Sequence, residues 1–155
     1  MENETNYTEL KQMLQSLIEN NDYNVTILSN ASALLNDYLK DINWVGFYLL
    51  RNNELILGPF QGHPACTNIP LNRGVCGACA TSKETIIVKN VHEFKTHIAC
   101  DSNSNSEICV PLFYNNEFYG LLDIDSPSFS RFDEVDKVNL EQIAKIIEVN
   151  LKDER

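Results

Sequence analysis

Positive charge is scarce in this sequence, and no long apolar run is present. The 155 residues include 12 Lys+Arg and 22 Asp+Glu, which gives a formal net charge of −10. Nucleic acids and anionic lipids are polyanions, so this charge disfavours both as the main partner. A membrane span needs about 20 consecutive apolar residues, and no segment comes near that length. Residues 1–6 are acidic and polar, which does not fit a secretory or transit segment, so we expect a cytoplasmic protein.

Internal repeats and low-complexity linkers are absent as well. Hydrophobic residues make up 43% of the chain, which excludes the disordered class. A chain of this length has room for one sizeable core and little room for two. We therefore expect one domain that covers residues 1–155.

Helical periodicity is present near both ends of the chain. A first helix is predicted by the spacing of Leu10, Met13, Leu14, Leu17 and Ile18. A second helix is predicted to start at Asn24, a good N-cap residue, and to carry Val25, Leu28, Leu35 and Leu39. The segment Ser130–Asp133 fits a capping box for a last helix. The apolar stripe of that helix is predicted to comprise Leu140, Ile143, Ala144, Ile147 and Leu151, widened by Val135, Val138, Ile146 and Val149.

The segments between these helices are typical of strands joined by tight turns. One hairpin is predicted over residues 43–57, around Asn52-Asn53. Another is predicted over residues 110–124, around Asn115-Asn116. Residues 58–106 are polar and irregular, and we expect a loop with short elements there. Helices at both ends and a hairpin-rich centre predict an α+β fold, with a central antiparallel sheet flanked by the N- and C-terminal helices.

The chain contains an odd number of cysteines, which argues against an extracellular disulfide framework when no signal peptide is present. They are Cys66, Cys76, Cys79, Cys100 and Cys109. Cys100 lies in a polar, turn-rich segment three residues after His97, a setting that suits a reactive thiol. Cys66 also lies in a loop-like segment. The apolar neighbours of Cys109 instead indicate an ordinary buried core residue.

Cys76 and Cys79 form a C-x-x-C pair, for which two interpretations exist. A redox motif of this kind opens a helix within an α/β unit, and no βαβ pattern is present, so a thioredoxin-like site is disfavoured. Zinc is a second, minor alternative, with four ligands drawn from the three histidines, Cys66, Cys76, Cys79 and Cys100. Structural zinc sites usually show two such pairs, and this sequence has one, so we expect no bound metal.

Three carboxylates are candidates for acid chemistry or for binding a cation. Asp123 and Asp125 alternate at the end of a predicted strand, which places them on one face. Two close carboxylates repel, which raises the pKa of one toward that of a useful acid; alternatively the pair binds an ammonium group. Glu107 would join them from the neighbouring strand, but a two-residue turn pairs it with Ile124, on the wrong face. A bulge or a three-residue loop would correct this register, and Pro111 is compatible with a bulge or a strand edge.

Two aromatic residues share a face of the first predicted strand. Trp44 and Tyr48 are four residues apart, so both point to the same side. They are either core aromatics or the wall of a pocket, since an indole packs well against a cation or a methyl-sulfur group. Together with the carboxylates they indicate a small polar ligand.

The combined motifs resemble those of the free methionine-(R)-sulfoxide reductases, a family built on the GAF fold. The resemblance covers residues from Asn43 to Ile147. It is carried by the segments Asn43-Trp-Val-Gly-Phe-Tyr, Leu57-Gly-Pro-Phe-Gln-Gly, Ile69-Pro, Arg73-Gly-Val-Cys-Gly, His97-Ile-Ala-Cys-Asp, Ser104-Asn-Ser-Glu-Ile and Leu122-Asp-Ile-Asp-Ser. Typical GAF domains are ligand sensors and lack this set of cysteines.

The resemblance implies distinct roles for the cysteines. Cys100 would be the nucleophile, Cys66 the resolving partner, and Cys76 a second or alternative resolver. The division between Cys66 and Cys76 stays open, since family members differ in it. Cys79 and Cys109 are not part of the family's pattern.

The resemblance also implies a substrate site. Glu107, Asp123 and Asp125 would bind and activate the substrate. Asp123 is the candidate proton donor, with Asp125 or Glu107 as alternates. Trp44 and Tyr48 would form the wall of an enclosed pocket.

The implied reaction is the reduction of free L-methionine-(R)-sulfoxide, which would give the protein a part in the response to oxidative stress. A thiolate at Cys100 would attack the sulfoxide sulfur and become a sulfenic acid, which condenses with Cys66 or Cys76 to a redox-active disulfide. Thioredoxin would reduce that disulfide, and neither a metal nor an organic cofactor is required. Backbone N–H groups between Ser102 and Ser106 would bind the substrate carboxylate.

Two other functions remain as alternatives. A GAF-type sensor would bind a small molecule without turnover and would normally carry an output domain, for which 155 residues leave no room. A zinc-stabilised or thiol-based redox regulator would contain a metal or a disulfide and have no small-molecule substrate. A homodimer is compatible with the amphipathic terminal helices.

Overall fold

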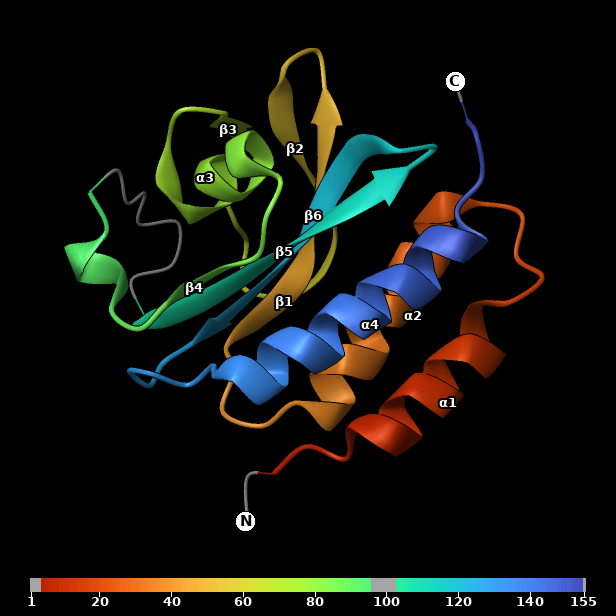
Figure 1. The fold of residues 1–155 in the computed structure, drawn as a ribbon, viewed down its shortest axis with the longest axis horizontal. Helices are drawn as coiled ribbons and strands as arrows, with labels where there is room; N and C mark the ends of the chain where they lie inside the picture. Colours follow the sequence, from red (N-terminus) through yellow and green to blue (C-terminus); the bar gives the residue numbers. More distant parts are fainter. Residues whose placement is uncertain (1–3, 96–102, 155) are drawn as a thin grey trace.

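An antiparallel sheet of six strands forms the centre of the structure, a computed structural model that describes residues 4–95 and 103–154 (Figure 1). The strands follow the order β3-β2-β1-β6-β5-β4 across the sheet. Their bounds are β1 Trp44–Arg51, β2 Glu54–Gly62, β3 Asn68–Pro70, β4 Ile86–Val88, β5 Ser106–Tyr114 and β6 Glu117–Ser126. The helices are α1 Tyr7–Ile18, α2 Asn24–Tyr38, α3 Gly74–Ser82 and α4 Glu134–Asn150, with one 3₁₀ turn, η1 Val91–Glu93. This arrangement confirms the predicted α+β fold with its flanked antiparallel sheet.

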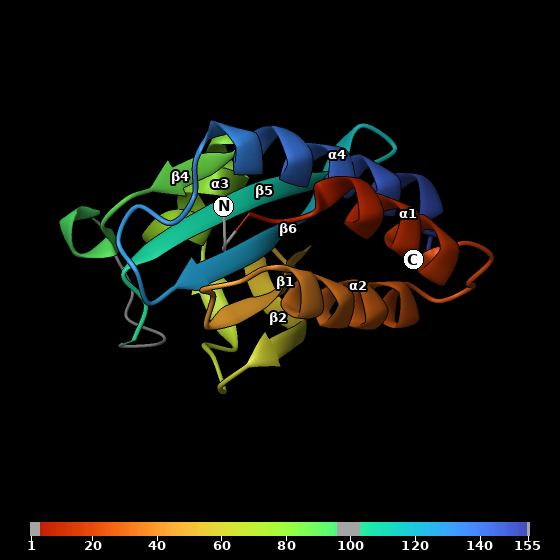
Figure 2. The same ribbon diagram turned by 90° about the horizontal axis from the view of Figure 1, so that it is seen from below.

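Helices α1, α2 and α4 lie together on one side of the sheet, and α3 lies on the other side (Figure 1 and Figure 2). Strand alternation produces both layers, because successive side chains point to opposite faces. In β1, Val45 and Phe47 pack in the core under the three helices, whereas Trp44 and Tyr48 pack on the side of α3. None of the helices in the described ranges combines the length and the apolarity that a membrane crossing requires.

Both predicted hairpins are present, and their turns use a left-handed backbone. The φ angles are 50° and 62° at Asn52 and Asn53, and 53° and 64° at Asn115 and Asn116. A type I′ turn has positive φ angles at both central residues, and Asn adopts such angles more readily than most residues. The polar stretch 58–106 was predicted to be loop with short elements, but β2 extends into it as far as Gly62, and the nine-residue helix α3 lies within it.

The second helix starts where predicted, but Asn24 is not its N-cap. Tyr23 takes that position and makes no side-chain capping bond. The buried Asn24 side chain instead donates from Nδ2 to the carbonyl oxygen of Lys152, and its Oδ1 accepts from the N–H of Lys152, both at 2.8 Å. Asn24 therefore fixes the C-terminal segment against α2. Val25 was expected on the buried face of this helix, but it is 62% exposed.

The last helix has a capping box, but the prediction of its position was wrong. Oδ1 of Asp133 accepts from the N–H of Asp136, and Oδ2 of Asp136 accepts from the N–H of Asp133, both at 3.0 Å. Ser130, the expected N-cap, has a φ of 54° and belongs to the turn before the helix. The expected stripe is buried at Leu140, Ile143, Ala144, Ile147 and Leu151. The valines expected to widen it are exposed, namely Val135, Val138 and Val149.

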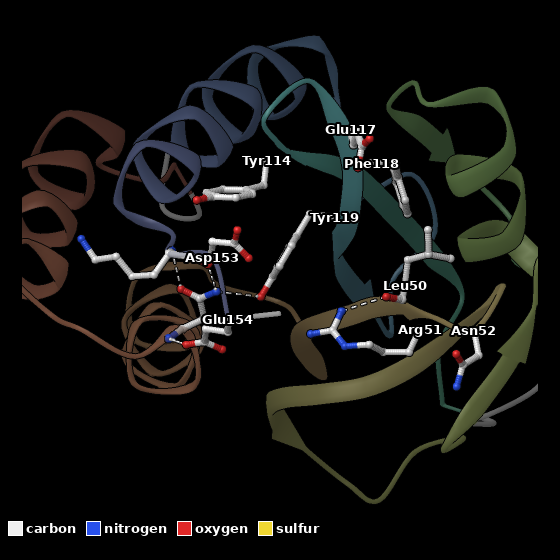
Figure 3. Close-up of a pocket in the computed structure, with 11 residues that line it drawn as sticks. Leu50, Arg51, Asn52, Tyr114, Glu117, Phe118, Tyr119, Asp153 and Glu154 are labelled. Atoms are coloured by element: carbon white, nitrogen blue, oxygen red, sulfur yellow. Dashed lines mark hydrogen bonds between the residues drawn. The ribbon is translucent and has the colours of Figure 1, made fainter.

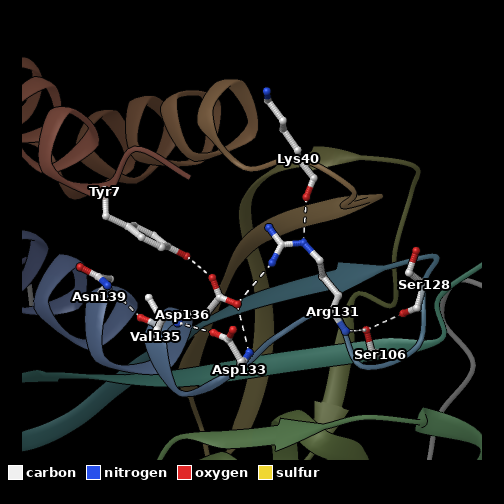
Figure 4. A network of polar contacts seen from close by, with 9 residues as sticks. All are labelled: Tyr7, Lys40, Ser106, Ser128, Arg131, Asp133, Val135, Asp136 and Asn139. Atoms are coloured by element: carbon white, nitrogen blue, oxygen red, sulfur yellow. Dashed lines mark hydrogen bonds and ion pairs between the residues drawn. The ribbon is translucent and has the colours of Figure 1, made fainter. Parts of the chain in front are cut away.

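Asp136 also joins α4 to α1 and to the start of β5 (Figure 4). Its Oδ1 accepts from the hydroxyl of Tyr7 at 2.6 Å, and its Oδ2 lies 3.3 Å from Nη1 of Arg131. Nε of Arg131 donates to the carbonyl oxygen of Lys40 at 2.9 Å. The N–H of Arg131 donates to Oγ of Ser106 at 3.3 Å. One buried carboxylate thus holds three segments that are distant in the sequence.

Replacing Asp136 should therefore destabilise the fold. Asp136→Ala removes the capping box and leaves the Arg131 guanidinium without its ion pair, so we expect a loss of about 3 kcal/mol in the free energy of unfolding. Glu134→Ala is the matched control on the same helical turn, because the Glu134 side chain is exposed and its pair with Lys137 contributes about 0–1 kcal/mol. Urea unfolding of both variants tests this, and equal losses would contradict it.

Candidate active site

The register between β5 and β6 decides which polar side chains share the sheet face on the side of α3. Next to the turn, Tyr114 pairs with Glu117, and at the far end Glu107 pairs with Asp125. These pairings differ by one residue, because the ladder skips Tyr119 of β6. The bulge that the sequence prediction required is therefore present, and it brings Glu107 onto the face of Asp125.

Packing around Tyr119 is that of a bulge. Phe118 packs on the α3 side, and Tyr119 packs with the core under the helices. Beyond this point the side chains of β6 again alternate between the two faces, but their pairing with β5 is shifted by one residue. Gly120 follows, and a Cβ there would lie 2.4 Å from the carbonyl oxygen of Tyr48, so the bulge needs glycine at this close approach. Pro111 is not the bulge residue. In β5, only Glu107, Ile108 and Cys109 pair with β4, and Pro111 lies beyond them. The missing N–H of Pro111 therefore removes no hydrogen bond between β5 and β4.

Two carboxyl groups and two thiols meet on this face. Glu107 of β5 and Asp123 of β6 are only 8% and 5% exposed. Sγ of Cys109 lies 3.3 Å from Oδ1 of Asp123 and 3.6 Å from Oε2 of Glu107. Cys76 reaches the cluster from α3, with its Sγ 3.6 Å from Sγ of Cys109 and 3.8 Å from Oε2 of Glu107. Asp125 is half-buried and lies beside them, as the partner of Glu107 across the ladder.

The carboxyl groups of this cluster differ in their electrostatics. No ion pair found among the described residues includes Glu107 or Asp123. Burial raises the pKa of Glu107 well above its ordinary value, and the charges of Asp123 and Asp125 raise it further. Burial also raises the pKa of Asp123, but hydrogen bonds with Glu107, Cys109 and Cys76 lower it. Both carboxyl groups of the pair therefore favour the neutral acid more than an ordinary carboxyl does, Glu107 more strongly than Asp123.

Trp44 and Tyr48 form an aromatic wall beside the carboxyl groups. Their ring centroids are 5.9 Å apart, and Phe60 of β2 also stacks with Trp44, at 5.2 Å between centroids. Nε1 of Trp44 donates to the carbonyl oxygen of His63 at 3.1 Å, and the hydroxyl of Tyr48 donates to that of Cys66 at 2.8 Å. The wall therefore also holds the segment that carries Cys66 against the sheet.

The cysteines fall into two groups. Cys66 is half-buried and disulfide-bonded, whereas Cys76, Cys79 and Cys109 are buried free thiols. A hydrogen bond with Cys109 lowers the pKa of Cys76, but burial and the charges of Asp123 and Asp125 raise it to about 12. Burial likewise raises the pKa of Cys79. Cys100, the predicted nucleophile, lies outside the described residues, as does His97.

The C-x-x-C pair does open a helix after a strand, since α3 follows β3. Cys79 nevertheless stays in the packing under α3, while Cys76 enters the carboxyl cluster. The zinc set considered from the sequence is not assembled in the described part of the chain, because Cys66 is disulfide-bonded and the His92 ring contacts Asn105 at 2.8 Å. The Asn105 N–H was expected to be available for a substrate carboxylate, but it donates to the carbonyl oxygen of Ser126.

Sequence reasoning missed two residues of this site. Cys109 was interpreted as plain core, yet its thiol contacts both buried carboxyl groups. Its spacing of two from Glu107 was the available signal, because residues two apart in a strand share a face. Phe60 was missed as well, since it reaches Trp44 only through a register shift of β2 against β1 between Gly46 and Tyr48.

A separate hollow of about 320 Å³ lies where the C-terminal segment meets the β5–β6 hairpin and the end of β1 (Figure 3). Its lining includes Tyr114, Tyr119 and Glu154 and none of the residues predicted as site residues. Oε1 of Glu154 accepts from the N–H of Asn24 at 2.7 Å, so the polar groups here hold the C-terminal segment. The candidate active site is the cluster on the side of α3.

Comparison with known proteins adds to this geometry. The GAF domain family model matches residues 12–151. Free methionine-R-sulfoxide reductase of Escherichia coli (strain K12) is 45% identical over 142 residues, which cover 92% of this chain and 86% of that protein. The structure of fRMsr of Staphylococcus aureus in complex with substrate is 59% identical with a TM-score of 0.93, covering 97% of this chain and 98% of that one. The structure of free methionine-R-sulfoxide reductase from Neisseria meningitidis in complex with its substrate is 42% identical with a TM-score of 0.89. The match covers 93% of this chain and 87% of that one.

These matches extend over almost the whole chain, so they include the sheet, both hairpins and the carboxyl cluster. The identities lie well above the level at which only the fold is shared. The resemblance inferred from the motifs is confirmed: the chain belongs to the free methionine-(R)-sulfoxide reductases, a family of oxidoreductases built on the GAF domain.

Proposed function

We propose that this chain reduces free L-methionine-(R)-sulfoxide to L-methionine. The observation that carries the proposal is the buried pair Glu107 and Asp123, which lies beside an aromatic wall and has no cationic partner in residues 4–95 and 103–154. A free amino acid provides an ammonium group for such a site, and a methionine within a peptide does not. Relatives with this activity in their names support the same substrate.

The substrate is held at both of its ends in this proposal. Its ammonium group binds the carboxylates of Asp123 and Asp125, which share one face of β6. Its methyl-sulfur end packs against Trp44 and Tyr48, because sulfur and methyl groups interact favourably with aromatic rings. The carboxyl pair and the aromatic wall then orient the sulfoxide between them.

Glu107 is the proton donor in this proposal, in place of Asp123, which was the first candidate from the sequence. The sulfoxide oxygen must be protonated to leave, so the donor must hold a proton at neutral pH. Burial and two neighbouring carboxylates favour the neutral acid at Glu107 and raise its pKa. Asp123 receives hydrogen bonds that favour its charged form. The two residues thus divide acid chemistry and ammonium binding between them.

The redox step transfers oxygen from the substrate to a cysteine. The Cys100 thiolate attacks the sulfoxide sulfur while Glu107 donates a proton to the sulfoxide oxygen. The attack forms a bond between the Cys100 sulfur and the substrate sulfur, and the sulfur–oxygen bond breaks so that the protonated oxygen leaves as hydroxide. Hydroxide then attacks the Cys100 sulfur, the bond between the two sulfurs breaks with its electron pair going to methionine, and Cys100 becomes a sulfenic acid. The thiol of a second cysteine then attacks Cys100, which forms a disulfide and releases water.

Cys66 is the resolving cysteine in this proposal, in preference to Cys76. Among the described cysteines only Cys66 is disulfide-bonded, which leaves Cys100 as its proposed partner. Cys76 is buried among carboxyl groups and its pKa is raised to about 12, so it forms little thiolate at neutral pH. An external dithiol must reduce the disulfide after each turnover, and thioredoxin is the proposed reductant.

Two expectations from the sequence stay predictions here. A cytoplasmic location agrees with the need for a dithiol reductant. A homodimer through the terminal helices agrees with the exposure of Met13 and Leu17 on α1 and of Val135 and Val138 on α4. A GAF-type sensor is the rival function, and it differs from the reductase because it would bind methionine sulfoxide without consuming it.

Cysteine variants test the proposed redox step. Wild-type protein should oxidise NADPH through thioredoxin and its reductase when given free L-methionine-(R)-sulfoxide, and Cys100→Ser should not. Cys66→Ser should release a single equivalent of methionine and then stop, because its sulfenic acid is not resolved. Cys79→Ala is the matched control, since Cys79 lies outside the cluster, and it should keep turning over. Sustained turnover by Cys66→Ser would assign resolution to another cysteine, and turnover by Cys100→Ser would contradict the nucleophile.

Carboxyl variants test the division of roles. Glu107→Gln keeps the shape of the side chain but cannot donate the same proton, so kcat should fall by roughly 10²–10⁴-fold with a smaller change in KM. Asp123→Asn should mainly raise KM, because it weakens ammonium binding. Steady-state measurement of kcat and KM for the two variants shows which residue donates the proton and which binds the ammonium group. The opposite pattern would return the role of proton donor to Asp123.

The raised pKa of Glu107 also predicts how stability depends on pH. The folded state keeps a proton that the unfolded state releases above about pH 4.3, so stability falls as pH rises from there toward the folded-state pKa. Glu107→Gln has no such dependence. Its urea midpoint should therefore exceed that of wild type by more at about pH 8 than at about pH 5.5. The exposed control Glu134→Gln should show no difference between the two pH values, and an equal gain for Glu107→Gln at both would contradict a protonated Glu107.

A further inference from the structure

The cluster of two thiols and two carboxyl groups at the site also has the composition of a metal site. Cys76, Glu107, Cys109 and Asp123 each offer one ligand atom, and these four atoms all lie within 4.8 Å of one another. All four side chains are buried. The residues come from α3, β5 and β6, so the fold and not a single flexible loop brings them together.

Four of the six separations between these atoms are close to those around a tetrahedral ion. Zinc bonds of about 2.3 Å to sulfur and 2.0–2.2 Å to oxygen imply tetrahedral edges of about 3.8 Å between two sulfurs and about 3.6 Å between sulfur and oxygen. The observed distances are 3.6 Å from Cys76 to Cys109, 3.8 Å from Cys76 to Glu107, and 3.6 Å and 3.3 Å from Cys109 to Glu107 and Asp123. The remaining two pairs, Asp123 with Cys76 and Asp123 with Glu107, lie within 4.8 Å.

We propose that Cys76, Glu107, Cys109 and Asp123 form a binding site for a thiophilic divalent cation, Zn²⁺ or Cd²⁺. Thiolate and carboxylate oxygen together select such an ion over Mg²⁺ or Ca²⁺, which prefer oxygen alone. The ion displaces the two thiol protons and the proton of Glu107 to solvent, and it bonds directly to four buried groups that form no ion pair within the described ranges. Cys76 and Cys109 are the ligands that the proposed reaction does not use, and Cys109 lies in contact with both carboxyl groups.

The metal and the substrate would exclude each other, and this part of the inference rests on the proposed function. Glu107 and Asp123 cannot hold the ion and also serve the substrate. Zn²⁺ should therefore inhibit turnover competitively with methionine sulfoxide. The ion would act as a reversible inhibitor and not as a cofactor.

The binding test uses the full chain in the form in which Cys66 is disulfide-bonded, so that this cysteine does not compete for metal. Equilibrium dialysis against Zn²⁺ with elemental analysis should give one equivalent per chain, and Cd²⁺ should add a thiolate-to-metal charge-transfer band in the ultraviolet. Cys109→Ala should weaken binding by roughly 100-fold or more and lose the band. Cys79→Ala, which removes a neighbouring buried thiol outside the cluster, should bind as wild type does.

Two results would overturn the proposal. One is that wild type shows no saturable binding of Zn²⁺, and the other is that wild type and Cys109→Ala bind Zn²⁺ equally. If Cys109→Ala does not fold, Glu107→Gln serves as the second variant, and unchanged binding there would overturn the site equally. Stoichiometric metal binding without any turnover of methionine sulfoxide would leave the metal site standing and refute the proposed function, so the two failures are distinguishable.

Discussion

The pairing of β5 with β6 is the constraint on which the site depends. The ladder runs from the type I′ turn at Asn115 and Asn116, and without an extra residue it would set Glu107 against Ile124. The bulge at Tyr119 shifts the pairing by one position and sets Glu107 against Asp125 instead. A strand that slips by one residue turns every side chain to the other face. Without the bulge residue, Glu107 would therefore face the apolar core, and with it Glu107 joins the acidic cluster.

The surrounding structure holds that register in place. Tyr119 packs into the core under the helices, and its hydroxyl accepts from Nδ2 of Asn24 at 3.3 Å. Gly120 allows β1 to approach, since any Cβ there would meet the carbonyl oxygen of Tyr48. At the other end of β5, Oγ of Ser106 accepts from Arg131, whose guanidinium pairs with Asp136. Packing thus holds the bulge of β6 and the start of β5, the strand that carries Glu107.

The buried carboxyl and thiol groups of the site destabilise the fold, and the same groups are the ones suited to chemistry. Two carboxyl groups and two thiols are buried on one face with no cation paired to the carboxyls in the described residues, and each of the four groups has a raised pKa. Such a cluster favours binding of a positive group, because any cation that enters relieves the repulsion. The ammonium group of a free amino acid and a thiophilic metal ion are the two occupants that we propose for this cluster.

Sequence patterns predicted those parts of the site that depend on local periodicity. Alternation alone placed Trp44 with Tyr48 and Asp123 with Asp125. Glu107 needed a bulge that no local pattern located, because the shift arises from packing of Tyr119 against residues distant in sequence.

The errors at the helix ends have the same cause. Asn24 and Ser130 are good capping residues, but tertiary contacts use Asn24 for the C-terminal segment, and the chain turns at Ser130 with positive φ. Cys76 was placed in the site only through the family resemblance, since nothing in its own segment shows that α3 brings it against β5. The assembly of Cys76 with Cys109 is a property of the fold and could not be read from spacing.

The central claim is that buried carboxylates on this face recognise the ammonium group of a free amino acid. The most direct measurement compares the turnover of free L-methionine-(R)-sulfoxide with that of its N-acetyl derivative, which carries the same sulfoxide without the charge. We predict that kcat/KM for the acetylated compound is lower by roughly 100-fold or more, since an unpaired buried carboxylate is costly. Equal turnover of the two compounds would contradict the account.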